Sequence, residues 1–340
     1  MDKVIIIAEA GVNHNGDINL AKKLIDVAVN AGVDYVKFQT FKSDNLVSKA
    51  AKKADYQIQN TENTSESQLE MLKKLELSHD QHHELFSYCK GKDISFFSTA
   101  FDLDSLAFLR ELGLSIVKVP SGEITNLPYL RKAAYLFSKV IISTGMSTID
   151  DVEKALNVFL DAGIKKEDIY ILHCNTEYPT PMKDVNLLAM LAIKNKFNVQ
   201  IGYSDHTLGI EVPIAAVALG GKMIEKHFTL SRSLPGPDQR ASIEPEELKA
   251  MVSAIRNIEL SISGSGLKIP SEGELRNVIL ARKSIHVSKK LYKGHIITNE
   301  DIISLRPGTG ISPMNWDSLI GKKLKNDKNE FDLLYLSDLI

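Results

Sequence analysis

Eight short apolar runs in this 340-residue sequence end in polar or ionisable residues. Their carboxyl, amine, hydroxyl and imidazole groups are the ones that bind anions and metal ions or move protons. A single Ser or Thr after a strand usually caps a turn, and a single Lys usually lies at the surface. Eight such positions together indicate one site. The residues are Glu9, Lys37, Gln39, Thr99, Lys118, Ser121, Glu123, Ser143, His173, Ser204, His206, Glu225 and His227.

Two lysines and four hydroxyl residues in this set suit a small anion. Lys37 and Lys118 each stand between two apolar residues. The hydroxyl residues are Thr99, Ser121, Ser143 and Ser204. Lysine supplies a point charge, whereas hydroxyl groups donate hydrogen bonds without adding charge. The combination predicts a site for a phosphate and an adjacent carboxylate, which implies a small phosphorylated acid as substrate.

Two histidines follow consecutive runs and are candidate ligands of one divalent cation. His206 and His227 stand where each run passes into the next loop, so their imidazoles can converge. No third protein ligand is evident, although Glu9 and Glu225 are candidates. Alternatively, both histidines are hydrogen-bonded residues of the folded core. A metal with open positions would polarise a carbonyl group, while Glu9 and Glu123 would transfer protons or activate water.

The runs alternate with longer amphipathic stretches, which predicts an α/β fold with a closed (β/α)₈ TIM barrel. From residue 4 to residue 260 the chain has the usual length of such a barrel, about 250 residues. Active sites of these barrels lie at the carboxyl ends of the strands, where the polar residues fall. The expected strands are 4–8, 35–39, 94–98, 116–119, 140–143, 169–173, 199–203 and 223–227, and the clearest helices are 20–31, 79–90, 102–112, 148–162 and 244–260. Thr148, which precedes two Asp residues, is expected to cap its helix.

An insertion of residues 42–77 separates the second and third runs. It has a polar middle and follows the end of an expected strand. We therefore expect it to lie over the mouth of the active site or against a partner. The adjacent histidines His82 and His83 fall in the helical stretch after the insertion and are expected at the surface.

The end of the chain differs in composition from the barrel. Residues 261–271 are rich in Gly and Ser and contain Pro270, as in a flexible linker, and 275–282 predict a short helix. Residues 298–301, Thr-Asn-Glu-Asp, are expected to begin a helix. We expect a barrel domain of 1–262, a linker of 263–282 and a small domain of 283–340. So small a domain buries little of its own surface and should be docked.

Charge and composition argue against several classes of protein. The sequence has 41 basic and 43 acidic residues and no long basic run, so nucleic acid is not an expected partner. It has no apolar stretch of the roughly 18 residues that cross a membrane, and no signal-peptide pattern at its N-terminus. Its two cysteines, Cys89 and Cys174, fit neither a disulfide framework nor a Cys-based zinc site. We expect a cytoplasmic protein.

Taken in order, these segments resemble the sialic acid synthase family along essentially the whole chain. The matching segments are Ala8-Glu-Ala-Gly-Val-Asn-His-Asn-Gly16, Val36-Lys-Phe-Gln-Thr40, Lys118-Val-Pro-Ser-Gly-Glu123, Ile142-Ser-Thr-Gly-Met146, His173-Cys174, Tyr178-Pro-Thr-Pro181, Tyr203-Ser-Asp-His-Thr207, Glu225-Lys-His-Phe-Thr229 and Pro235-Gly-Pro-Asp238. Residues from 283 onward resemble the antifreeze-like (SAF) domain that follows the barrel in this family. The clearest match there is Leu305-Arg-Pro-Gly-Thr-Gly-Ile311.

The resemblance implies a role for each matching residue. His206 and His227 would bind a divalent metal, Mn²⁺ or Mg²⁺. Phosphoenolpyruvate would be held by Lys37, Lys118, Ser121, Ser143 and Ser204, with Gln39 and Thr99 nearby. The sugar would lie among Glu9, Tyr178 and Asp238, with Thr176 standing where some relatives carry Asn. In a homodimer with swapped C-terminal domains, Arg306 would reach the site of the partner subunit.

The implied reaction joins phosphoenolpyruvate, an N-acylated mannosamine and water, and yields a sialic acid and phosphate. With N-acetylmannosamine as the first candidate sugar, the chain would be an N-acetylneuraminate synthase. The alternative sugar is 2,4-diacetamido-2,4,6-trideoxymannose, which would make it an N,N'-diacetyllegionaminate synthase. Two other classes stay open: a different metal-dependent aldolase or hydrolase, and an antifreeze-like binding protein without catalysis. The last would leave the polar rim of the barrel unexplained.

Overall fold

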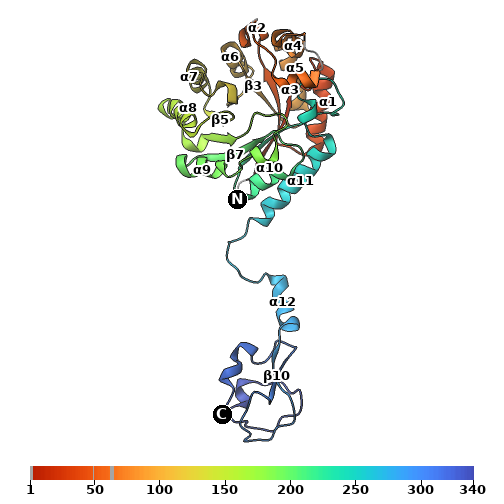
Figure 1. Cartoon of the computed structure of the whole chain (residues 1–340), viewed down its shortest axis with the longest axis vertical. Helices are drawn as coiled ribbons and strands as arrows, with labels where there is room; N and C mark the ends of the chain where they lie inside the picture. The colour runs from red at the N-terminus through yellow and green to blue at the C-terminus, as the bar shows by residue number, and fades with distance from the viewer. Residues whose placement is uncertain (1–2, 49, 62–64) are drawn as a thin grey trace. The chain divides into compact units, whose positions relative to one another are not determined.

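The computed structural model describes residues 3–48, 50–61 and 65–340, which form two compact units. Met1–Gly264 carries an α/β barrel, and Ser265–Ile340 carries a small domain with two strands (Figure 1). Helix α12 (Glu272–Ala281), which the sequence analysis places within the linker, is part of the second unit. No helix among the described residues is long and apolar enough to span a membrane.

Eight parallel strands form the barrel, which confirms the predicted fold class. Their hydrogen-bonded order is β3-β2-β1-β8-β7-β6-β5-β4. The circle is completed between β3 and β4, where the Tyr129 hydroxyl donates to the Ala100 carbonyl at 2.8 Å and lies 3.4 Å from that of Lys118. The strands are β1 (Ile5–Gly11), β2 (Tyr35–Thr40), β3 (Ser95–Ala100), β4 (Ile116–Val119), β5 (Lys139–Ser143), β6 (Ile169–His173), β7 (Gln200–Asp205) and β8 (Met223–His227).

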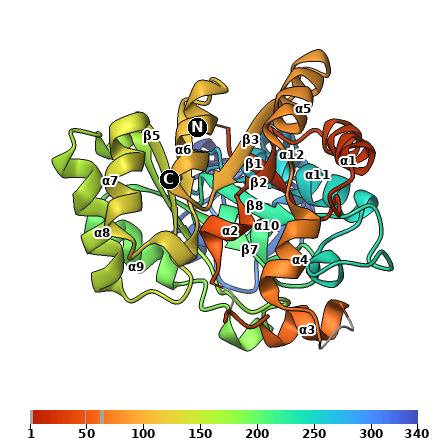
Figure 2. The same cartoon turned by 90° about the horizontal axis from the view of Figure 1, so that it is seen from above.

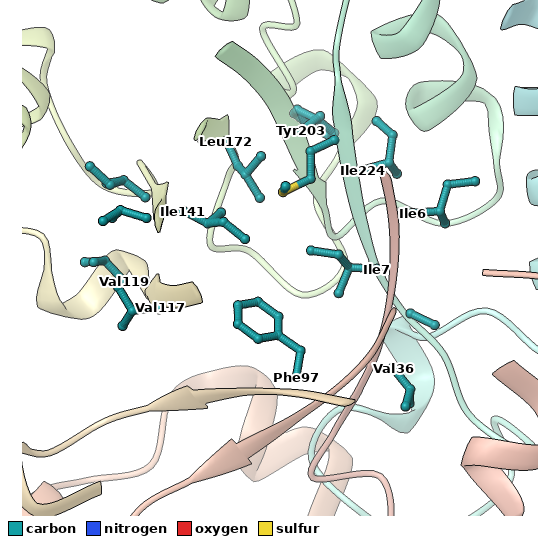
Figure 3. Packing of buried hydrophobic residues seen from close by; sticks show 14 of the residues in the cluster. Ile6, Ile7, Val36, Phe97, Val117, Val119, Ile141, Leu172, Tyr203 and Ile224 are labelled. Carbon is teal, nitrogen blue, oxygen red and sulfur yellow. The ribbon is translucent and has the colours of Figure 1, made fainter. Parts of the chain in front are cut away.

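Side chains alternate between the inside and the outside of the barrel, because a strand repeats every two residues. Ile7, Phe97 and Ile141 project into the centre of the barrel (Figure 3), within one continuous hydrophobic core. Two residues further along their strands, Glu9 and Thr99 occupy the next inward positions. The apolar core therefore passes directly into a polar layer at the carboxyl ends of the strands.

Helices surround the strands, as Figure 2 shows for α5 to α9. The Thr148 side chain accepts from the Asp151 amide, and the Asp151 side chain accepts from the Thr148 amide, which confirms the predicted cap of α8. The barrel helices are α1 (Ile18–Ala31), α5 (His79–Gly91), α6 (Leu103–Glu111), α7 (Leu127–Leu136), α8 (Ile149–Asp161), α9 (Ala189–Phe197), α10 (Glu211–Ala218) and α11 (Pro245–Ser261).

The prediction that His82 lies at the surface is wrong, whereas His83 is exposed as expected. His82 is fully buried because both of its ring nitrogens find partners. Its Nε2 lies 2.7 Å from the Thr40 hydroxyl, and its Nδ1 lies 2.9 Å from the Ser78 carbonyl oxygen. A polar residue on a helix can thus be buried at no loss of hydrogen bonding.

The insertion forms three short helices, α2 (Ser43–Leu46), α3 (Asp55–Thr61) and α4 (Gln68–Leu75). It shares a separate apolar cluster with the loops after β1 and β2, made of Val12, Phe41, Met71, Leu72 and Leu75. Tyr56 of α3 stacks on Tyr178, which follows β6, with ring centroids 5.0 Å apart. The insertion therefore lies over the carboxyl end of the barrel, as predicted, although residues 49 and 62–64 fall outside the described residues.

A fully buried ion pair joins β7 and β8. Asp205 and Lys226 are register partners, and the Lys226 ammonium donates to the Asp205 carboxylate and to the Thr207 carbonyl. Both side chains are 0% exposed. Because each residue directly precedes a histidine of the predicted site, the pair fixes the strand ends that carry His206 and His227.

The second unit contains antiparallel strands β9 (Ser284–Val287) and β10 (Ile302–Leu305). The expected helix at 298–301 is wrong. The Thr298 amide and hydroxyl donate to Asp301 at 2.9 and 2.7 Å, as at a helix start. The segment forms a turn instead, because Ile302 and Ile303 continue as a strand and β-branched residues favour strands.

Asp301 is the most heavily bonded carboxylate of the second unit. It is 2% exposed, and it lies 2.8 Å from both His295 and Lys289. Burial alone would raise the pKa of Asp301, but the hydrogen bonds from Lys289, His295 and Thr298 outweigh it and hold this pKa well below its usual range. The carboxylate therefore stabilises the unit in its charged form.

We predict that Asp301→Asn destabilises the second unit by on the order of 2 kcal/mol at neutral pH. Since the folded pKa lies below the unfolded value of about 3.9, the contribution is complete well above pH 4 and is lost as the pH falls below it. Hydrogen exchange of the β9 and β10 amides in the full chain measures the effect. Exposed Asp317→Asn is the control, and equal protection in both variants would contradict the prediction.

Candidate active site

Four charged side chains meet at the carboxyl end of the barrel. Glu9, Lys37, Lys118 and Glu225 come from β1, β2, β4 and β8, and each is at most 4% exposed. The Lys37 ammonium lies 2.7 Å from Glu9 and 3.7 Å from Glu225. The Lys118 ammonium lies 2.9 Å from both oxygens of Glu225. Two positive and two negative groups therefore compensate one another away from water.

Hydroxyl groups border this charge cluster. Lys37 donates to the Thr99 hydroxyl at 2.7 Å, and the Ser204 hydroxyl donates to Glu225 at 2.9 Å. The Ser143 hydroxyl is buried and has no hydrogen-bond partner within the described ranges. A buried hydroxyl group without a partner is costly unless a ligand or water satisfies it. Ser143 is therefore poised to bind a polar ligand.

The loops after β4, β5 and β6 pack closely beside the cluster. Ser121 lies in the turn η1 (Ser121–Glu123), where its hydroxyl accepts from the Gly145 amide at 2.9 Å and contacts the Cys174 sulfur at 3.2 Å. Any side chain at position 145 would collide with its surroundings, because a Cβ there would lie 2.4 Å from the Thr176 methyl carbon. Glycine thus permits the close approach of these three loops.

The pKa values of the two buried carboxyl groups are shifted in opposite directions. Burial raises the pKa of Glu9 to about 7; Lys37 opposes this shift and the neighbouring Glu225 adds to it. Burial would also raise the pKa of Glu225, but Lys118 and Lys37 outweigh it and hold that pKa far below its usual range. Because their pKa values lie far apart, Glu9 can transfer protons near neutral pH while Glu225 stays charged and compensates the lysines.

His206 and His227 lie close together, with ring centroids 5.4 Å apart. Burial lowers the pKa of His206 to about 4, and burial together with His206 lowers the pKa of His227 well below its usual range. The His206 Nδ1–H donates to the Asn175 carbonyl, which leaves Nε2 as the free lone pair. The His227 Nδ1 is buried, has no hydrogen-bond partner within the described part of the chain, and lies 3.9 Å from Asp238.

This donor set fits a weakly chelated divalent cation. Neutral imidazoles are metal ligands, and a backbone carbonyl that orients one of them is typical of such sites. Among the residues that the structure describes, no group of three His, Cys, Asp or Glu side chains is arranged to hold a metal. Of the two candidate third ligands from the sequence, Glu225 is occupied by Lys118 and Ser204, and Glu9 is paired with Lys37 at 2.7 Å. His206 and His227 are therefore the two protein side chains that could bind a divalent cation here.

A cavity of about 280 Å³ lies beside the histidines, under the insertion. Gln39, Tyr178, His227 and Asp238 contribute to its lining. Burial raises the pKa of Asp238 to about 6. Of the residues assigned to the sugar by resemblance, Tyr178 and Asp238 line this cavity and Thr176 does not. Glu9 is linked to the cavity through a 3.4 Å hydrogen bond from Gln39.

Glu123 of the predicted site is not joined to the cluster, and Arg306 belongs to the second unit. Glu123 is half-buried, and its carboxylate accepts from the Asn126 side chain at 2.6 Å. Arg306 is exposed in the second unit, where its Nε donates to the Ala281 carbonyl at 3.0 Å. The roles of both residues stay predictions.

Two features of the site do not follow from the sequence alone. The first is that Glu225 pairs with both lysines and is not a free metal ligand. The two-residue spacing to His227 predicts that Glu225 points inward, but it does not predict the pairing with Lys118 on β4. Tyr56, which stacks on Tyr178, falls in the polar part of the insertion, where no periodic pattern marks it.

We predict that Lys118→Met destabilises the barrel by about 3–5 kcal/mol, because it leaves the buried Glu225 carboxylate with Lys37 alone, at 3.7 Å. The double variant Lys118→Met/Glu225→Met also removes the unpaired carboxylate and should regain most of the lost stability. Urea unfolding measures all three proteins, with exposed Lys154→Met as the control. If Lys118→Met and Lys154→Met unfold at the same urea concentration, Lys118 has no stabilising role.

Comparisons with known proteins agree with this architecture. Residues 24–268 match the NeuB family, and residues 282–340 match the SAF domain. The chain is 50% identical over 334 residues to N,N'-diacetyllegionaminic acid synthase of Campylobacter jejuni, covering 98% of this chain and 99% of that protein. It is 48% identical to the enzyme of the same name from Legionella pneumophila, covering 94% and 90%. A crystal structure of the N-acetylneuraminic acid synthetase of Leptospira borgpetersenii superposes with a TM-score of 0.70 at 35% identity, covering 82% and 90%.

Proposed function

Because this chain belongs to the NeuB family of sialic acid synthases, we propose that it makes N,N'-diacetyllegionaminate from phosphoenolpyruvate, 2,4-diacetamido-2,4,6-trideoxymannose and water. The family condenses phosphoenolpyruvate with an acylated amino sugar, so the chain is an enzyme and the reading as a non-catalytic antifreeze-like protein is wrong. The observation that carries the choice of sugar is the similarity to two legionaminic acid synthases over nearly the whole chain. N-acetylmannosamine, the first candidate from the sequence, is less well supported.

Lys37 and Lys118 would bind the phosphate and carboxylate of phosphoenolpyruvate, with Ser121, Ser143 and Ser204 as hydroxyl donors. The two ammonium groups are compensated by Glu9 and Glu225. An incoming anion would take over part of that compensation, so it would be held in a site whose charges are already in place. Glu9, with its raised pKa, would exchange a proton with the substrates near neutral pH.

The new bond would join C3 of phosphoenolpyruvate to the aldehyde carbon of the open-chain sugar. Water would add at C2, and phosphate would leave by cleavage of the C–O bond. His206 and His227 would hold Mn²⁺ or Mg²⁺, which supplies Lewis-acid polarisation of the aldehyde. Tyr178 and Asp238 would orient the sugar in the adjoining cavity, because correct placement of two substrates supplies much of the rate.

We predict that phosphate is released from phosphoenolpyruvate only when the diacetamido sugar and Mn²⁺ are both present. His206→Ala should abolish this release and weaken Mn²⁺ binding in titration calorimetry, because one of two imidazole ligands is removed. Exposed His83→Ala is the matched control and should behave as the wild type. Sugar-independent release, or no release with either candidate sugar, would contradict the proposed reaction.

The active form would be a homodimer in which the small domain of each chain completes the site of its partner. Arg306 is exposed, and its guanidinium makes no ion pair within the described ranges, so it is not engaged by a carboxylate of its own domain. Its chain has a linker of Gly and Ser residues that permits exchange. A cytoplasmic location stays a prediction.

We predict that inactive His206→Ala and inactive Arg306→Ala proteins regain activity when their subunits are exchanged. A mixed dimer would contain one site with both residues intact, so about half of the wild-type activity per mixed dimer is the upper limit for one intact site in two. Phosphate release after mixing measures the recovery. If mixed dimers form, as shown by mass spectrometry of differently tagged chains, and stay inactive, Arg306 acts within its own chain or not at all.

A further inference from the structure

The cavity beside His227 is lined both by the barrel and by the insertion. The barrel strands and the loop after β8 contribute the polar residues Gln39, His227 and Asp238. The insertion contributes apolar residues, among them Leu46 and Val47, together with polar side chains from α3 and α4. A ligand that fills the cavity therefore meets polar groups beside His227 and both apolar and polar groups at the insertion.

Leu46 and Val47 are apolar residues of the cavity lining that keep part of their surface exposed. The cluster against which they pack, which includes Met71 and Leu72, also lines the cavity but is buried to 9% exposure or less. Leu46 and Val47 pack against that cluster but are only half-buried themselves. The cluster thus supports the positions of Leu46 and Val47, which are the more exposed apolar residues of the cavity lining.

The insertion also brings a side-chain amide to the same cavity. Gln68, the first residue of α4, lines it together with the apolar residues. An amide can donate to and accept from another amide, whereas Leu and Val offer no hydrogen bond to a hydroxyl group. Amide and apolar surface side by side match an acetamido group and a methyl group.

We propose that Leu46, Val47 and Gln68 form a specificity pocket for the end of the sugar that lies far from its aldehyde. The proposal rests on the proposed function, since the reacting aldehyde must lie at the histidines for the far carbons to reach the insertion. The pocket accepts a deoxygenated, N-acylated end, as in a 2,4-diacetamido-2,4,6-trideoxy sugar. It disfavours N-acetylmannosamine, because Leu46 and Val47 offer no hydrogen bond to the hydroxyl groups that this sugar carries at C4 and C6.

The size of the expected preference follows from the chemistry of such pockets. One methyl group more or less in an apolar pocket changes kcat/KM by about 10–200-fold. The wild type should therefore prefer the diacetamido sugar over N-acetylmannosamine by at least about tenfold in kcat/KM. Val47→Thr, which keeps the shape and introduces a hydroxyl group, should lower that ratio about tenfold, mainly through a higher KM for the diacetamido sugar.

The test compares kcat/KM for the two sugars at saturating phosphoenolpyruvate and Mn²⁺. Variants are Val47→Thr and Leu46→Gln, with Val158→Thr as the matched control on helix α8, half-buried outside the barrel. The KM for phosphoenolpyruvate should not change in any of them, which separates a pocket effect from loss of fold. Gln68→Leu should also reduce the preference, because the amide partner of the second acetamido group is lost.

The outcomes distinguish this proposal from the proposed function. A wild type that uses neither sugar overturns both. A wild type that uses N-acetylmannosamine as well as or better than the diacetamido sugar leaves the synthase reaction standing and overturns the pocket. If the ratio of kcat/KM for the two sugars is unchanged in both Val47→Thr and Leu46→Gln, the pocket is likewise overturned and the synthase reaction stands. If the ratio falls in both variants and not in Val158→Thr, the result supports the pocket.

Discussion

The compensation of buried charge among Glu9, Lys37, Lys118 and Glu225 is the constraint on which the rest of the site depends. Charged groups at most 4% exposed are costly away from water unless each faces an opposite charge at hydrogen-bonding distance, as Glu9 faces Lys37 and Glu225 faces Lys118. Because the four residues come from β1, β2, β4 and β8, only a closed ring of strands can bring them together. An anion that binds beside the two lysines would have to take over part of the compensation that Glu9 and Glu225 now supply.

The same strands supply both the stability and the chemistry of the barrel. Inward positions carry apolar residues such as Ile7 and Phe97 at the centre and polar residues one repeat further on, so a shift of one residue in register would expose the core and bury the wrong groups. On the other face of β7 and β8, the buried Asp205–Lys226 pair holds the register at the strand ends. The position of each candidate metal ligand is thus set by a residue that does not itself face the site.

Local interactions decide the parts of the fold that the sequence predicts, whereas contacts between distant elements decide the parts that it does not predict. Strands β4, β6 and β8 were predicted with their observed bounds, and the cap of α8 with its observed residue, because local patterns of apolar, β-branched and capping residues decide them. The burial of His82 and the turn at Asp301 were predicted wrongly. Both depend on partners supplied by other elements, the Thr40 hydroxyl in one case and the pairing of β10 with β9 in the other.

By itself the sequence determined the barrel, the polar rim and the residue types of a candidate anion and metal site, because two-residue alternation and strand-end placement are local properties of the chain. Only the tertiary structure decided which of these residues meet. It paired Glu225 with Lys118, 107 positions apart, and stacked Tyr56 on Tyr178, while it left Glu123 outside the cluster. Closure of the strands into a ring sets such distances. No spacing along the chain encodes them, because they depend on the packing of every strand and loop between.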